Sequence, residues 1–331
     1  MTKQSAPSPR PASHAGVDMT VRPLGNTRLA VSGICVGTSA LGGWAPQYGY
    51  DVDAATAVAT VRRALEGPFN FIDTANEYGS GGNSERRIGR ALAEVGGLPP
   101  GFVIGTKIDP LPGSAVFTGA RARQSVQESL DRLGLSRLQL VYLHDPQRIT
   151  FDAATASGGP VAALVQMRDE GVIEHIGIAG GSIDLQLRYL LTGIFDVVIS
   201  HNKFTLVDQT AEPLMNAAAF LGVAFVNAAP FGGGILAKGP EAVPRYNYLP
   251  ATERTLGRVR AMRTICDEYN VPLAAVALQF SQRDPRVAST IVGMSQPSRI
   301  DLTAELAGYP IPSELWRRLR RLISQGQTGA M

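Results

Sequence analysis

The chain has 331 residues, of which 44% are hydrophobic and 18% are charged, and its formal net charge is +3 at pH 7. This balance predicts a soluble globular protein with a full core. The charge is small, no basic stretch is interleaved with aromatic residues, and no run of 18 apolar residues occurs, so we expect neither nucleic-acid binding nor a membrane span.

Residues 1–19 are rich in Ser, Pro and Ala and lack an apolar stretch, so a disordered tail is expected there rather than a signal peptide. A hairpin signal follows at Leu24-Gly25-Asn26-Thr27, between Thr20–Pro23 and Arg28–Val31. Beyond it, short apolar strands alternate with helices. The expected strands are Ile34–Gly37, Phe69–Asp73, Phe102–Lys107, Leu138–His144, Ile173–Ile178, Asp196–Ser200, Val223–Asn227 and Val287–Val292. The expected helices are Asp53–Leu65, Ser84–Glu94, Gly119–Leu133, Pro160–Glu170, Asp184–Leu191, Ala211–Leu221, Glu253–Tyr269, Leu273–Gln282 and Pro297–Leu306.

Eight such units most economically close into a (β/α)₈ barrel, here with an N-terminal hairpin and a C-terminal amphipathic helix around Leu315–Ile323. We expect a single domain over residues 20–325. An open doubly wound sheet is the alternative, but the turn after its first strand, Gly37–Gly42, lacks the G-x-G-x-x-G pattern.

Ionisable side chains gather where successive strands end. Asp73, Lys107 and His144 end three neighbouring strands, and Tyr78 lies in the loop after the first of them. In a parallel barrel these positions share one face, which is where such folds keep their chemistry. They predict a proton-transfer centre: Tyr78 exchanges the proton, Lys107 lowers the pKa of the phenol, Asp73 pairs with Lys107, and His144 orients the substrate oxygen.

Two other interpretations of these residues stay open at this stage. Each residue taken singly could have a purely structural role, but the four together at one barrel end argue against that role for the whole set. A zinc site needs several His, Cys or Asp ligands, and only His144 beside Asp145 ends a strand in that way, so we expect no metal.

The sequence around these residues resembles the aldo-keto reductase superfamily over about residues 20–310. The resemblance is carried by Phe71-Ile72-Asp73-Thr74-Ala75, Tyr78-Gly79, Asn83–Gly89, Gly105-Thr106-Lys107, Ser129–Gly134 and Tyr142-Leu143-His144. It implies that Asp73, Tyr78, Lys107 and His144 form a catalytic tetrad. It also implies a nicotinamide cofactor extended across the barrel mouth, and no metal.

The resemblance further implies where the cofactor is bound. The expected contacts are Gly37, Thr38, Asp73, Gly180, His201, Ala229, Pro230, Phe231, Gly232, Gly234, Leu236, Gly293, Met294, Ser295 and Arg299. Ala179 and Gly180 stand where many members have a Ser-Asn pair, and His201 or Ser200 stands in place of the usual glutamine. Arg299 is the one cation near the adenosine end, where NADP-binding members usually add a Lys, so NAD is favoured over NADP.

Within the superfamily, the chain looks like the branch of aldose and pyridoxal dehydrogenases. The function expected is oxidation of a cyclic hemiacetal to a lactone, with Trp44, Tyr78 and His144 contacting the substrate. The alternatives are an NADPH-dependent aldehyde or ketone reductase and a non-catalytic protein like the β subunits of potassium channels. Two cysteines, Cys35 and Cys266, are too few and too distant for a disulfide framework and fit a cytoplasmic protein.

Overall fold

The computed structural model describes residues 21–111, 113–114 and 116–327. The tail expected at residues 1–19 and the first residue of the expected hairpin, Thr20, lie outside the described residues, and the single domain over 20–325 stays a prediction. No helix in the described part of the chain is long and apolar enough to cross a membrane.

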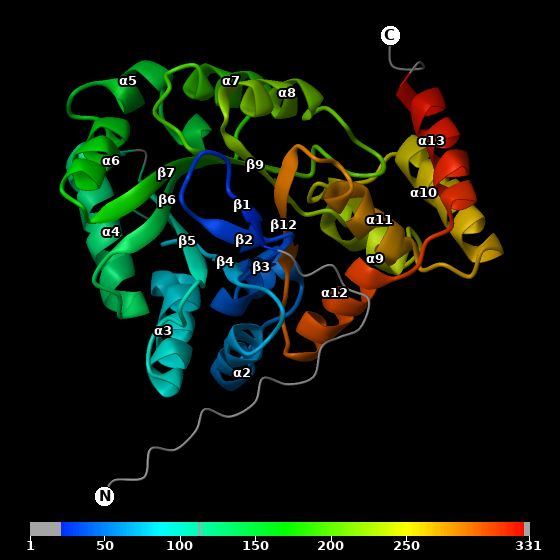
Figure 1. Cartoon of the computed structure of the whole chain (residues 1–331), viewed down its shortest axis with the longest axis horizontal. Coiled ribbons are helices and arrows are strands. Elements are labelled where there is room, and N and C mark those ends of the chain that lie inside the picture. The colour runs from blue at the N-terminus through cyan, green and yellow to red at the C-terminus, as the bar shows by residue number, and fades with distance from the viewer. Residues whose placement is uncertain (1–20, 112, 115, 328–331) are drawn as a thin grey trace, which may run out of the picture.

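Eight parallel strands close into a barrel in the order β12-β3-β4-β5-β6-β7-β8-β9, which confirms the predicted (β/α)₈ architecture (Figure 1). The strands are β3 (Ile34–Gly37), β4 (Phe71–Asp73), β5 (Val103–Ile108), β6 (Leu138–His144), β7 (Ile173–Ala179), β8 (Val197–His201), β9 (Ala224–Ala228) and β12 (Val287–Gly293). All of the predicted barrel strands are present, and their ends differ from the expected ones by two residues or fewer.

Helices surround the barrel (Figure 1). They are α2 (Ala54–Leu65), α3 (Asn83–Val95), α4 (Gly119–Leu133), α6 (Pro160–Asp169), α7 (Ile183–Leu190), α8 (Glu212–Leu221), α10 (Glu253–Glu268), α11 (Leu273–Gln282), α12 (Ser298–Gly308) and α13 (Ser313–Gln327). The expected C-terminal helix, α13, packs on α10 through Leu315, Trp316 and Leu319, all buried. Local sequence starts several helices: the Asp53 side chain accepts a hydrogen bond from Thr56 N and caps α2.

The sequence did not predict the short elements in the loops. These are α1 (Ala45–Tyr48), α5 (Phe151–Thr155), α9 (Ile235–Lys238), the 3₁₀ turns η1 (Ser39–Gly42), η2 (Ser80–Gly82), η3 (Pro146–Arg148) and η4 (Gly232–Gly234), and the hairpin of β10 (Arg245–Tyr246) and β11 (Leu249–Pro250). With two to five residues each, none is long enough to show a repeated hydrophobic pattern.

Alternate residues of each strand face the barrel interior. On β6, Leu140 and Tyr142 belong to the interior cluster, whereas Val141 and Leu143 pack in the layer between strands and helices. The hairpin of β1 (Val21–Pro23) and β2 (Ala30–Ser32) closes the N-terminal end of the barrel, because Leu24 joins the interior cluster with no exposed surface. The polar residues at the C-terminal strand ends therefore lie at the opposite end.

The Tyr142 ring fills the barrel interior because its two neighbouring strands carry glycine beside it. Tyr142 pairs with Lys107 on β5 and with Gly177 on β7. A Cβ at Gly177 would lie 2.2 Å from the Tyr142 ring, and one at Gly105 would lie 2.9 Å from it. Only glycine leaves room for the ring at these positions.

Candidate active site

Strand alternation turns Asp73, Lys107 and His144 toward the barrel interior. Each stands two residues after an interior position: Phe71, Gly105 and Tyr142. Their strands β4, β5 and β6 are adjacent in the barrel. The structure thus brings the three strand-end residues predicted from the sequence into one layer.

Lys107 and Asp73 form a buried ion pair with a complete set of hydrogen bonds. Lys107 Nζ donates to Asp73 Oδ1 at 2.7 Å, to Asp73 Oδ2 at 2.8 Å and to the Thr74 carbonyl oxygen at 2.6 Å. Both residues are 3% exposed. An ammonium carries three donors, so all of them are used within the protein.

Tyr78 lies in the loop after β4, between the ammonium and the imidazole. Lys107 Nζ is 4.5 Å from the centroid of its ring, and the His144 ring meets it edge-to-face at a centroid distance of 5.9 Å. The following residue, Gly79, has a φ of 80° and lies so close to Gly42 that a Cβ would fall 2.2 Å from the Gly42 carbonyl oxygen. This close backbone approach fixes the loop that carries the phenol.

The pKa of Tyr78 shifts in the direction opposite to our expectation. Burial raises the pKa of the phenol well above its usual range, and the negative charge of Asp73 raises it further. The expected lowering by Lys107 fails because Asp73 and Thr74 already occupy the ammonium, which leaves little uncompensated positive charge for the phenol. Tyr78 is therefore a neutral hydroxyl near neutral pH.

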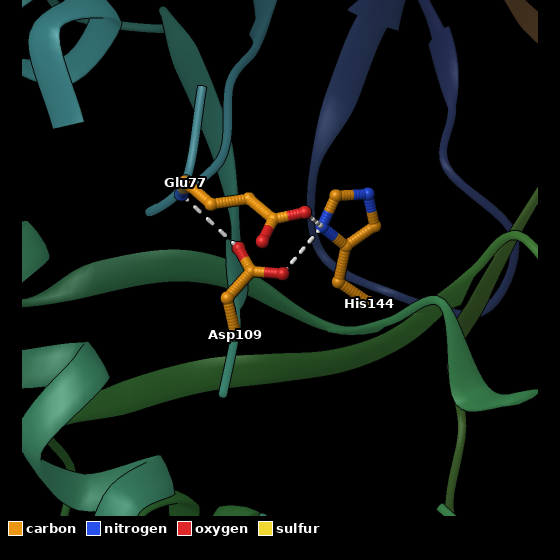
Figure 2. A group of neighbouring side chains, drawn as sticks. All are labelled: Glu77, Asp109 and His144. Carbon is orange, nitrogen blue, oxygen red and sulfur yellow. Dashed lines mark hydrogen bonds and ion pairs between the residues drawn. The ribbon is translucent and has the colours of Figure 1, made fainter. Parts of the chain in front are cut away.

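A carboxylate that the sequence analysis missed supports the imidazole. Asp109 is fully buried and follows β5, and its Oδ1 lies 2.7 Å from His144 Nδ1 (Figure 2). Its other oxygen accepts a hydrogen bond from the Glu77 backbone N–H at 3.2 Å. Burial lowers the pKa of His144, but the Asp109 carboxylate more than offsets this, and the pKa is raised overall. Side-chain alternation could have identified Asp109 from the sequence, because it stands two residues after Lys107 and so lies on the same side of the strand.

Glu77, Asp109 and His144 bring ligand atoms to within 4.8 Å of one another, close enough to hold a cation (Figure 2). A protein cation already lies there: Arg148 Nη1 is 2.7 Å from Glu77 Oε2 and 3.6 Å from Asp109 Oδ1. The guanidinium supplies the positive charge that the carboxylates need, so their geometry is explained without a metal.

Some of the residues expected to contact the cofactor face the barrel mouth, and others are fully buried. His201 stands two residues after the inward-facing Ile199 on β8 and so faces inward as well, whereas Ser200, one residue after Ile199, faces outward. The Thr38 hydroxyl has no exposed surface and donates to the Asp73 carbonyl oxygen at 2.8 Å. Met294 and Leu236 are likewise fully buried. Gly180 has a φ of 86°, and a Cβ there would lie 2.4 Å from Asp145 Oδ1.

The loop after β9 has an unusual backbone. Ala229 has a φ of 59°, and Gly232, Gly233 and Gly234 follow with φ values of 58°, 76° and 108°. Pro230 is buried, and Phe231 packs against both the barrel layer and the cluster under α13. Gly233 is exposed, with no atom within 4 Å of a Cβ added to it. Such a run lets a ligand approach the backbone closely.

Beyond β12, an arginine lies near exposed backbone. Gly293 is exposed, Ser295 and Arg299 are partly exposed, and the Arg299 guanidinium has no ion pair with any residue that the structure describes. Asn202 Oδ1 is buried without a partner in the same described set. An unpaired guanidinium and an unsatisfied amide oxygen are features that a phosphate-bearing, amide-bearing cofactor would satisfy.

Aromatic residues stand on the rim of the same end. Trp44, the expected substrate contact, is 47% exposed and precedes α1. Tyr248 has a φ of 66°, and its ring lies 6.4 Å from that of His201. The base of its hairpin is fixed by Tyr246, whose hydroxyl donates to the Asn202 carbonyl oxygen at 2.6 Å. The sequence analysis did not predict this hairpin, because its strands are too short to show a strand pattern.

Comparisons with known proteins agree with the barrel fold. The model of the Aldo/keto reductase family matches residues 33–324. D-threo-aldose 1-dehydrogenase from Pseudomonas sp is 33% identical over 80% of this chain and 86% of its own. Pyridoxal 4-dehydrogenase from Microbacterium luteolum is 30% identical over 90% of this chain and 96% of its own. The solved holo form of an aldo-keto reductase from Bacillus halodurans shares the fold, with a TM-score of 0.75, 23% identity, and coverage of 92% of this chain and 96% of its own.

Proposed function

Because the chain belongs to the aldo/keto reductase family, we propose that it oxidises the hemiacetal carbon of an aldose, or of a similar cyclic hemiacetal such as pyridoxal, to a lactone with NAD. The chain is an oxidoreductase of the nicotinamide-dependent kind. The substrate class is supported by the two relatives above, whose names give an aldose and pyridoxal as their substrates.

The observation that carries this proposal is the convergence of Tyr78, His144 and the Lys107–Asp73 pair at one end of the barrel. Oxidation of a hemiacetal removes a hydride from carbon and a proton from the hydroxyl, and a C=O bond forms. The nicotinamide cofactor, when bound, supplies the hydride acceptor. In our proposal Tyr78 and His144 meet the hydroxyl, and Lys107 with Asp73 holds Tyr78 in place without moving a proton.

The neutral state of Tyr78 defines its proposed role. A phenol that keeps its proton can accept a hydrogen bond from the substrate hydroxyl and exchange its own proton only when a base lies beside it. His144 is the neighbouring base, in edge-to-face contact with the phenol. We therefore assign proton exchange to Tyr78 and His144 together.

For the cofactor, we propose that Gly37, Gly180 and His201 border the nicotinamide end and that Arg299 lies near the adenosine end. The remaining expected contacts stay predictions. A single cation near the adenosine end favours NAD. The unpaired Arg299 guanidinium is also the observation that supports the alternative, an NADPH-dependent aldehyde or ketone reductase, because a 2′-phosphate could pair with it.

A substrate panel tests the proposal. We expect NADH formation from NAD with at least one of fucose, arabinose, galactose or pyridoxal, accompanied by the lactone. Tyr78→Phe is expected to abolish most of the turnover while NAD binding, followed by calorimetry, is retained. Oxidation of NADPH by aldehydes or ketones, with no lactone formed from the panel, would favour the alternative. Near-normal turnover of Tyr78→Phe would exclude Tyr78 as the proton-exchanging group.

A further inference from the structure

We infer that Asp109 is a positioning residue for the reaction: it holds a proton on Nδ1 of His144 and leaves Nε2 open to receive the proton of the substrate hydroxyl. The inference rests on the proposed function. Asp109 is a fifth residue beside the four predicted from the sequence. It acts through His144 and is not assigned a contact with substrate or cofactor.

Asp109 is held rigidly by contacts at both its backbone and its side chain. Its N–H donates to Ser125 Oγ at 3.2 Å, and its carbonyl oxygen accepts from Arg121 Nε at 2.9 Å. Its Oδ2 accepts from the Glu77 N–H, so Oδ1 is directed at His144. A fully buried carboxylate with this many fixed contacts has one arrangement, and the imidazole must adapt to it.

The contact sets the tautomer of His144. A carboxylate only accepts hydrogen bonds, so the 2.7 Å contact requires Nδ1 to carry the proton. A neutral imidazole then has a lone pair on Nε2. Figure 2 shows that this second ring nitrogen points away from both carboxylates, and no residue in the described part of the chain bonds to it. Nε2 is therefore the basic nitrogen available to substrate.

The groups facing His144 favour a positive charge on its ring. Acidic groups come from four segments around it: Asp109 after β5, Glu77 in the loop after β4, Asp145 after β6, and Asp73 at the end of β4. The cations and other titratable groups around the ring are Lys107, Arg148, Tyr78 and His201. Among the acids, Asp109 makes the shortest contact, because Glu77 Oε1 is 4.0 Å from Nδ1.

These contacts define a balanced step. The substrate O–H bond breaks, and its proton passes to Nε2 of His144, directly or through the Tyr78 hydroxyl. The electron pair of the broken O–H bond forms the C=O bond as hydride leaves the carbon for the oxidised nicotinamide. The imidazolium so formed carries a proton on each ring nitrogen and is stabilised by Asp109. In a later step it loses the Nε2 proton to water.

Asp109→Asn tests the charge of the carboxylate while nearly keeping its shape. For wild-type enzyme, kcat/KM for oxidation is expected to rise with pH as His144 loses its proton. In Asp109→Asn the acid limb should move to lower pH by about one unit or more, because the charge that stabilises the imidazolium is gone. The plateau should fall about 10-fold or more, because an amide can also donate to Nδ1 and favour the wrong tautomer.

Asp145→Asn is the matched control, because it removes the same charge beside His144 without touching the Nδ1 contact. Asn tolerates the φ of 45° at this position. Its acid limb should move less than that of Asp109→Asn. Superimposable profiles for Asp109→Asn and wild type, or an equal shift in both variants, would overturn the assignment.

A second measurement needs no folded variant of Asp109. In wild-type enzyme labelled with ¹⁵N-histidine, the four histidines give separate signals, and His144→Gln identifies that of His144. Above its pKa, His144 should show the Nδ1–H tautomer, and an Nε2–H tautomer would overturn the inference. This result is separate from the proposed function, which fails instead if wild-type enzyme oxidises none of the substrates in the panel.

Discussion

The buried Lys107–Asp73 pair makes a quantitative prediction about stability. Lys107→Met leaves the Asp73 carboxylate without its partner in a site where both side chains are at most 5% exposed. Breaking such a pair costs about 3–5 kcal/mol of unfolding free energy, because an uncompensated charge stays buried. Asp73→Asn should cost a similar amount, because it leaves the Lys107 ammonium buried without its partner. The double variant Asp73→Asn/Lys107→Met removes both charges, so we expect it to be more stable than either single variant by about 2 kcal/mol.

Urea unfolding of the four proteins measures this coupling. Burial raises the pKa of Asp73, and Lys107 opposes that rise. In Lys107→Met the folded-state pKa therefore rises further, and the folded protein binds more protons than the unfolded one. The loss of unfolding free energy in Lys107→Met, relative to wild type, should accordingly be smaller at about pH 5 than at about pH 8. Additive single-variant losses, or a deficit that grows on acidification, would refute the account of a desolvated ion pair.

Three more changes test the barrel interior and the acidic cluster. Gly177→Ala should lower the unfolding free energy by about 1–3 kcal/mol, since its Cβ would lie 2.2 Å from the Tyr142 ring; an unchanged urea midpoint would contradict this packing. Tyr142→Phe removes a buried hydroxyl with no partner among the described residues, so stability should be unchanged or higher by up to about 1 kcal/mol, and a clear loss would reveal a hidden partner. Wild-type turnover should be unaffected by a strong chelator or by added Zn²⁺, because Arg148 already supplies the positive charge beside Glu77 and Asp109. Turnover of Arg148→Ala should become sensitive to Zn²⁺. Loss of wild-type turnover on chelation would indicate a bound metal.

The barrel could be predicted from the amino-acid sequence, because that inference depends on local patterns. Eight short apolar runs separated by amphipathic helices are visible one segment at a time, and parallel strands joined by helices leave few ways to bury both faces. The strand ends likewise sufficed to group Asp73, Lys107 and His144, because the C-terminal ends of parallel barrel strands share one face.

How these groups act on one another depends on contacts between distant parts of the chain, which the sequence does not show. Asp109 and His144 are 35 residues apart, and nothing local shows that a 2.7 Å contact joins them. The pKa of Tyr78 was expected to fall because an ammonium lies near it. It rises because burial and Asp73 outweigh an ammonium whose protons are already taken, and that balance depends on the distances between elements far apart in the chain.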